Sequence, residues 1–265
     1  MTDTHLPLDA DVTVIRTMPA EDPERRIPIH SLVITGTEPV LVDCGSSANE
    51  AEWWSQVEAV VDPPDVRWVF VSHDDVDHTG NLGQVLERCP HATVVSSWLI
   101  DQRQGVDGPI PRERSRWLND GETFDAGERR LVALRPPVYD APSTRGLYDV
   151  TSGVYWSVDC FGMVVPYAAD EVSDLDRDVW EDALREFPQL IGPWIAEVDP
   201  LRWRAAIGRV AGLDPKVIAS AHGPVIRRRD IERAMDVLAE VPRLPLRALP
   251  GQRELETILA STNTS

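Results

Sequence analysis

The sequence contains few cysteines and no long hydrophobic run. Its 265 residues include only three cysteines, Cys44, Cys89 and Cys160, which are widely spaced and form no Cys-x-x-Cys pair. This pattern favours neither a disulfide framework nor a zinc ribbon, and we expect three small buried side chains. No apolar stretch approaches the length of a membrane span, and the N-terminus lacks the basic and apolar segments of a secretory signal. The sequence therefore predicts a cytoplasmic protein.

Positive charge is scarce as well. The chain carries 26 lysine and arginine residues against 44 aspartate and glutamate residues, so its formal net charge is -18, and Lys216 is its only lysine. A surface of this sign repels phosphate backbones and anionic lipid head groups. We therefore expect neither nucleic acid nor membrane among its partners, and a small-molecule ligand is the natural alternative.

The hydrophobic fraction of 42% lets the chain bury a full core, and no repeat or linker divides it. We expect one domain over residues 1–242 and a Pro-containing, polar tail over 243–265 that is docked on the domain or frayed. Short β-rich runs occur in both halves, and apolar residues recur at helical spacing over 178–192, 199–211 and 229–240. This pattern predicts a mixed α/β fold with sheets packed together and helices outside.

One short stretch, "SHDDVDH" at residues 72–78, concentrates metal-binding side chains. It follows the apolar run "VRWVFV", so His73, Asp75, Asp77 and His78 lie in a loop where a strand ends. Imidazole and carboxylate are side chains that bind divalent metals. A solvated acidic turn would account for the aspartates alone, but not for two flanking histidines in a chain that has only six. The stretch therefore predicts metal binding.

Two further strand ends offer the same kinds of ligand. "YWSVDCFG" places Asp159 at the end of an apolar strand, and "VIASAHGPVI" places His222 after another, followed by Gly223 and Pro224. A single histidine after a strand is more often a hydrogen-bonded structural residue. Three strand ends with histidine or aspartate together favour a shared metal site.

These motifs resemble those of the metallo-β-lactamase superfamily, whose signature is a His-x-His-x-Asp-His loop, a later histidine, a bridging aspartate and a final histidine. The resemblance covers about residues 10 to 228 and includes "PVLVDCG", where Asp43 matches the structural aspartate at a strand end. It implies an αββα sandwich of the metallo-β-lactamase type, with two metals at one edge between the sheets.

The chain departs from the hydrolase pattern at Asp75, which replaces the second histidine of the loop. A carboxylate here resembles the flavodiiron branch, whose loop reads His-x-Glu-x-Asp-His, and "VDCFG" and "AHGPV" also resemble motifs of that branch. The resemblance implies iron and the binding or reduction of O2 or NO. The His-Trp-Pro of that branch is replaced by "YDAP", and aligning Pro142 with its proline makes Asp140 the expected ligand and Tyr139 the alternative.

The resemblance implies a complete ligand set, with Asp159 bridging the two metals. One metal would be held by His73, Asp75 and Asp140, and the other by Asp77, His78 and His222. This oxygen-rich set favours iron, with manganese or zinc as alternatives. We expect no catalytic residue apart from the metal centre, and the residues expected beside it or in its pocket are His30, Tyr139, Arg145 and Tyr148.

Several of these neighbouring residues have two possible roles. His30 lies near the start of a strand that would pass close to the site, where it would be either structural or a hydrogen-bond donor. Arg145 would meet an anionic substrate or pair with Asp140 or Asp149. Tyr148 would line the pocket or belong to the core, and for Trp156 we expect the core.

The favoured function is that of a non-haem diiron protein that binds or reduces O2 or a related small oxidant. We expect no flavin-binding domain in this chain, so turnover would require a separate electron donor. A non-catalytic oxygen sensor and a metal-dependent hydrolase of acyl substrates are the alternatives, because carboxylates also support metal-activated water. The sequence leaves a homodimer open.

Overall fold

The fold is built on two β-sheets. The computed structural model describes residues 5–18, 27–104, 108 and 110–262. The first sheet has the strand order β1-β2-β3-β4-β5-β6-β7, in which β1 to β4 are antiparallel neighbours and β4 to β7 are parallel. Its strands are β1 (His5–Pro7), β2 (Val12–Thr17), β3 (Ile29–Ile34), β4 (Val40–Val42), β5 (Trp68–Phe70), β6 (Thr93–Ser96) and β7 (Ser115–Trp117).

The second sheet has the order β13-β12-β11-β10-β9-β8. Only β11 and β12 are parallel neighbours, and the other pairs are antiparallel. Its strands are β8 (Thr123–Ala126), β9 (Arg129–Leu134), β10 (Gly146–Asp149), β11 (Val154–Trp156), β12 (Val217–Ala219) and β13 (Ile226–Arg227).

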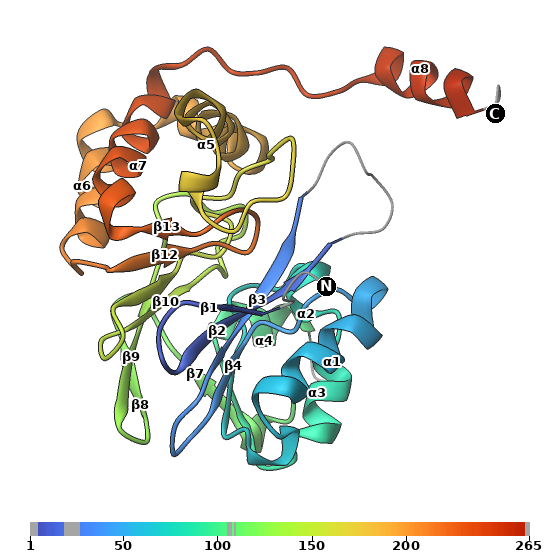
Figure 1. Ribbon diagram of the computed structural model, residues 1–265, viewed down its shortest axis with the longest axis vertical. Helices are drawn as coiled ribbons and strands as arrows, with labels where there is room; N and C mark the ends of the chain where they lie inside the picture. Colours follow the sequence, from blue (N-terminus) through green and yellow to red (C-terminus); the bar gives the residue numbers. More distant parts are fainter. Residues whose placement is uncertain (1–4, 19–26, 105–107, 109, 263–265) are drawn as a thin grey trace.

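Helices cover the outer faces of both sheets (Figure 1). The first sheet carries α1 (Glu50–Val60), α2 (Val76–Thr79), α3 (Leu82–Arg88) and α4 (Trp98–Gln104), and the second carries α5 (Arg177–Ile191), α6 (Pro200–Ala211) and α7 (Arg228–Glu240). Short 3-10 helices lie at Ser47–Asn49, Pro63–Asp65, Arg112–Arg114, Val172–Asp174, Pro193–Glu197 and Val241–Arg243, and α8 (Gln252–Thr262) is the last helix described.

Strand alternation divides the buried side chains between the layers. In β3, Leu32 and Ile34 join the core between the sheets, whereas Val33 joins the core beneath the helices of the first sheet. In β11, Trp156 faces the space between the sheets and Tyr155 faces α5 to α7. The two sheets therefore pack face to face between two helical layers, which confirms the predicted αββα sandwich.

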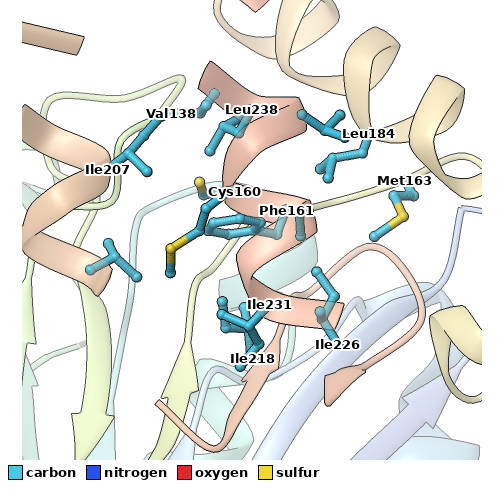
Figure 2. Close-up of a cluster of buried hydrophobic side chains, with 14 of the residues drawn as sticks. Val138, Cys160, Phe161, Met163, Leu184, Ile207, Ile218, Ile226, Ile231 and Leu238 are labelled. Atoms are coloured by element: carbon cyan, nitrogen blue, oxygen red, sulfur yellow. The ribbon is translucent and has the colours of Figure 1, made fainter. Parts of the chain in front are cut away.

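The helical layer over the second sheet packs on the loop that follows β11. Figure 2 shows side chains from this loop and from α5, α6 and α7 in one cluster. Phe161 is fully buried in it, and Trp203 Nε1 donates to the carbonyl of Leu238 over 3.0 Å. Each buried side chain of this size contributes about 1.5–3 kcal/mol. This packing anchors the backbone immediately beyond Asp159.

The helices predicted from apolar spacing are confirmed as α5, α6 and α7. The Asp199 side chain caps α6 by accepting from the backbone N–H groups of Leu201 and Arg202. The three cysteines are buried and unpaired, as expected. No helix among the described residues is long and apolar enough to cross a membrane.

The C-terminal segment differs from the expected tail in containing a helix. Residues 245–260 are exposed, and α8 follows an extended stretch that leads away from the sandwich (Figure 1). The apolar residues Leu255, Ile258 and Leu259 have the spacing of one helix face, although no helix was predicted here from the sequence. The division of the chain at residue 242 stays a prediction.

Candidate metal centre

The candidate ligands come from loops at one edge of the sandwich. The loop after β5 carries His73 and Asp75, the short helix α2 that follows it carries Asp77 and His78, Asp159 follows β11, and His222 follows β12. Asp140 lies in the loop after β9. Strand β9 runs in the same direction as β11, because both strands are antiparallel to β10. Strands that run in one direction end at one edge, so the topology brings these loops together.

Three side chains form the first group of ligand atoms. His73 Nε2 lies 3.8 Å from Asp75 Oδ2 and 3.7 Å from Asp140 Oδ2. Their ligand atoms are close enough together to hold one ion. We call His73, Asp75 and Asp140 metal group one.

Asp77, His78 and His222 form a second such group, which we call metal group two. Asp77 Oδ2 lies 3.6 Å from His78 Nε2 and 3.3 Å from His222 Nε2. Asp159 reaches both groups, because its Oδ2 lies 3.4 Å from His73 Nε2 and its Oδ1 lies 3.3 Å from His78 Nε2. The structure thus brings all seven predicted ligands together in the predicted grouping.

Two buried atoms at the centre of this arrangement indicate that it fits metal ions. Within the described part of the chain, His78 Nε2 and Asp159 Oδ1 have no hydrogen-bond partner. A buried polar atom without a partner costs about 1–3 kcal/mol. Donor atoms that are about 2.0–2.2 Å from a shared ion lie little more than 3 Å from one another. The donor types, their spacing and the two unpartnered atoms therefore suit two divalent cations.

Asp43 orients His78 and joins three strands. Its carboxylate accepts from His78 Nδ1 over 3.0 Å and from Trp156 Nε1 over 3.0 Å. The backbone N–H and the hydroxyl of Ser72 each donate to it over 2.8 Å. Because Nδ1 is used in this way, the lone pair of His78 Nε2 faces the site. His222 is held similarly, with Nδ1 donating to the carbonyl of Pro28 over 2.9 Å.

The backbone is strained at several positions next to the candidate ligands. Asp43, Val158 and Phe161 have φ angles of 61°, 59° and 64°, in the left-handed region that non-glycine residues seldom adopt. Each such residue costs on the order of 1–3 kcal/mol. At Gly223, where φ is 153°, an added Cβ would lie 3.0 Å from the backbone nitrogen of Met163. The surrounding core therefore has to hold the turns that present Asp159 and His222.

The charges of the site strongly influence one another. Burial opposes ionisation of Asp159, but the nearby histidines outweigh it and hold the pKa of this carboxyl well below its usual value. Burial also opposes the charged form of His222, yet Asp159 and Asp77 raise its pKa to about 9. The pKa of Asp140 is raised by burial and by the adjacent charges of Asp159 and Asp75. A metal ion that enters the site must therefore displace protons.

The residues that were expected beside the ligands or in the pocket have different positions in the structure. His30 lies beside the ligands, with Nδ1 3.2 Å from the carbonyl of Ser220, and burial lowers its pKa to about 3. The Tyr139 ring instead packs on Trp194, with the ring centroids 4.8 Å apart, and it belongs to neither metal group. Tyr148 belongs to the core beneath the helices, so the pocket alternative for this residue is wrong.

Arg145 contacts its own loop instead of pairing with Asp140 or Asp149, which was one of the two roles considered for it. Its guanidinium Nη1 donates to the carbonyl of Thr144 over 2.7 Å, with longer contacts to the two preceding carbonyls. Asp149 already accepts from Arg129 Nη1 over 2.6 Å. Arg145 turns back over its own loop because its backbone N–H donates to Ser72, which fixes the residue where the two loops meet.

Sequence reasoning passed over two contributors to the site. Trp156 is a core residue as predicted, but it also donates to the carboxylate that orients His78. Asp74, between two ligands, accepts from Ser143 and Arg103. In the sequence, Asp74 is marked only by its position between His73 and Asp75, because the residues that contact it lie in distant segments.

Comparison with known proteins assigns the family. The model of the ODP family beta lactamase matches residues 29–223, which is more than half of the chain. The chain belongs to this family. The ODP-family chain is 28% identical over 202 residues to a protein named putative diflavin flavoprotein A 1 from Nostoc sp., covering 75% of this chain and 33% of that protein. It is 24% identical over 205 residues to the anaerobic nitric oxide reductase flavorubredoxin of Pectobacterium atrosepticum, covering 75% and 39%.

Solved structures support the same fold. The rubredoxin oxygen:oxidoreductase of Desulfovibrio gigas matches with a TM-score of 0.79 and 17% identity, over 90% of this chain and 61% of that one. The flavodiiron protein of Giardia intestinalis matches with a TM-score of 0.80 and 17% identity, over 92% and 60%. The ODP-family chain spans about a third of the length of the diflavin relative. The resemblance to flavodiiron proteins inferred from the motifs is confirmed.

Proposed function

We propose that this chain holds a dinuclear iron centre and binds or reduces O2 or a related small oxidant such as NO. In this proposal metal groups one and two each hold one ion and Asp159 bridges them. The observation that carries the proposal is the position of Asp159, whose two oxygens lie 3.4 Å from His73 Nε2 and 3.3 Å from His78 Nε2. The names of the relatives, an oxygen oxidoreductase and a nitric oxide reductase among them, support the same chemistry.

The side chains of the protein determine the charge of this centre and the path by which solvent and a small oxidant reach it. Two bound irons would supply electrons and open coordination positions for a diatomic oxidant. The four carboxylates carry about four negative charges, which two divalent cations balance. The side chains of Asp75, Asp77 and Asp140 are 53%, 26% and 24% exposed, whereas those of His73 and His78 are each 1% exposed. In this proposal solvent and a small oxidant therefore reach the centre past the carboxylates of both metal groups.

Electrons reach the centre from a separate donor in this proposal. The Nostoc relative is named a diflavin flavoprotein, and the match covers only 33% of it. The name of this relative favours a flavin as the source of these electrons. We place the protein in the cytoplasm, where reduced donors are available.

The test is elemental analysis of protein purified from iron-supplemented and zinc-supplemented cultures. Absorption spectra are then recorded for the reduced protein before and after admission of air. We expect about two irons per chain and an oxygen-dependent absorption change. Steady O2 consumption with an artificial donor would identify an enzyme, and a stable oxygenated spectrum without consumption would identify a sensor. Two zinc ions, an unchanged spectrum and hydrolysis of acyl esters would instead support a hydrolase.

A further inference from the structure

Asp74 has contacts unlike those of its neighbours in the loop after β5. We call this loop, which carries His73 and Asp75, the ligand loop. Asp74 stands between His73 and Asp75, yet it belongs to none of the groups of ligand atoms. Its Oδ1 accepts from the Ser143 hydroxyl over 2.6 Å and from Arg103 Nη1 over 2.9 Å, and the same guanidinium nitrogen lies 3.0 Å from Oδ2. Only 16% of the side chain is exposed. Asp74 thus joins the ligand loop to α4 and to the loop that carries Asp140.

The loop from Asp140 to Arg145 is attached to the ligand loop at a second point. The backbone N–H of Arg145 donates to the carbonyl of Ser72 over 2.8 Å. Between these attachments the Thr144 N–H closes a turn on the carbonyl of Ala141 over 3.1 Å. The distance between the two loops is therefore set at two points, Ser72 and Asp74.

This attachment matters because metal group one takes its two carboxylates from different loops. Asp75 belongs to the ligand loop and Asp140 to the other, and their like charges repel until a cation binds. Metal group two has independent support, since His78 is held by Asp43 and His222 by the carbonyl of Pro28. Loss of the contacts of Asp74 should therefore affect one group and spare the other.

We propose that Asp74, held by Ser143 and Arg103, is the positioning residue that keeps Asp75 and Asp140 at the spacing of metal group one. The inference rests on the proposed dinuclear centre. Residues that orient ligands typically change metal affinity by about 10- to 100-fold when removed. The expected result is a protein that retains one ion tightly and holds the second weakly.

The experiment is anaerobic titration of the metal-free protein with iron(II), with bound iron measured after desalting. We expect two ions on the wild type, whereas Asp74→Ala binds the first normally and the second at least about 10-fold more weakly. Asp74→Asn keeps an oxygen that accepts from Ser143, so it should recover part of the affinity. Ser143→Ala removes only one hydroxyl and should show a smaller loss of the same ion, even if Asp74→Ala does not fold.

The control is Asp199→Ala, which removes the cap of α6 and lowers stability far from the site by about 1 kcal/mol. It should bind both ions like the wild type. In an Asp75→Ala background, Asp74→Ala should cause no further loss, because metal group one is already damaged. Equal weakening of both ions, or unchanged affinities in Asp74→Ala and Ser143→Ala, would overturn the positioning role. A wild type that binds no iron would instead refute the proposed centre.

Discussion

At the scale of single residues, the candidate carboxylate ligands differ in which metal group they reach. Asp159 reaches both metal groups and its side chain is 4% exposed, whereas Asp75 contacts only metal group one and is 53% exposed. We predict that Asp159→Ala loses both ions and that Asp75→Ala loses mainly one. Elemental analysis of the purified variants measures this, with His91→Ala as the control because His91 is exposed and lies in neither group. Equal metal content in all three variants would contradict the ligand assignment.

His30 predicts a specific dependence of stability on pH. Burial lowers its pKa from 6.5 to about 3 in the folded protein, so the fold disfavours the protonated ring. The contribution of the neutral His30 ring to the free energy of unfolding is therefore complete above the pKa of the unfolded state. It is lost as the pH falls toward the pKa of the folded state. Between about pH 7 and pH 5, the free energy of unfolding of the metal-free wild type should fall about 2 kcal/mol more than that of His30→Gln.

Denaturant unfolding with a chelator present measures this difference. His91→Gln is the matched control, because the exposed ring of His91 should leave the pH dependence like that of the wild type. If His30→Gln and the wild type lose equal stability over this range, His30 is not held as a neutral residue by the fold.

At the scale of elements, the end of β4 holds the sandwich together through Asp43. Its carboxylate bonds Ser72 after β5 and Trp156 in β11, so it connects strands of both sheets. Asp43→Ala would leave buried donors without partners at a cost of about 3 kcal/mol in the free energy of unfolding. Denaturant unfolding of metal-free protein measures the loss. Asp182→Ala, at a side chain that is 72% exposed, should change stability little, and an equally small effect at Asp43 would contradict the inferred connection.

The elements also explain which parts of the fold the sequence revealed. The helices α5 and α7 have apolar residues at a period of 3.6, and both were predicted within a residue of their observed ends. β13 has two residues and β7 has three, which is too short for alternation to be recognised. β10, "GLYD", is buried on both faces and therefore shows no alternation of polar and apolar residues.

At the scale of the whole molecule, the C-terminal segment lies outside the αββα layers (Figure 1). Residues 245–260 are exposed, and the ion pair between Arg247 and Glu186 lies at the surface. Surface ion pairs contribute about 0–1 kcal/mol. Truncation after residue 243 should therefore lower the free energy of unfolding by less than about 1 kcal/mol and leave iron binding unchanged.

Truncation after residue 240 is the control for this prediction. It also removes Val241, which is 2% exposed, and should cost about 1.5–3 kcal/mol. Thermal and denaturant unfolding of both truncated proteins would measure the two losses. A large loss on removal of residues 244–265 alone would show that this segment belongs to the domain.

The sequence by itself determined the donor types and the class of fold. Histidines and aspartates at strand ends predicted a metal site, because the chemistry of a ligand is a property of its side chain, and the resemblance of their motifs to a known superfamily implied two metals. The tertiary structure placed Asp140 rather than Tyr139 beside His73 and Asp75, and it showed Arg145 contacting its own loop. It also revealed the contacts of Asp74 with Ser143, 69 positions away in the chain. Such contacts depend on which distant segments meet, and no local pattern in the sequence encodes them.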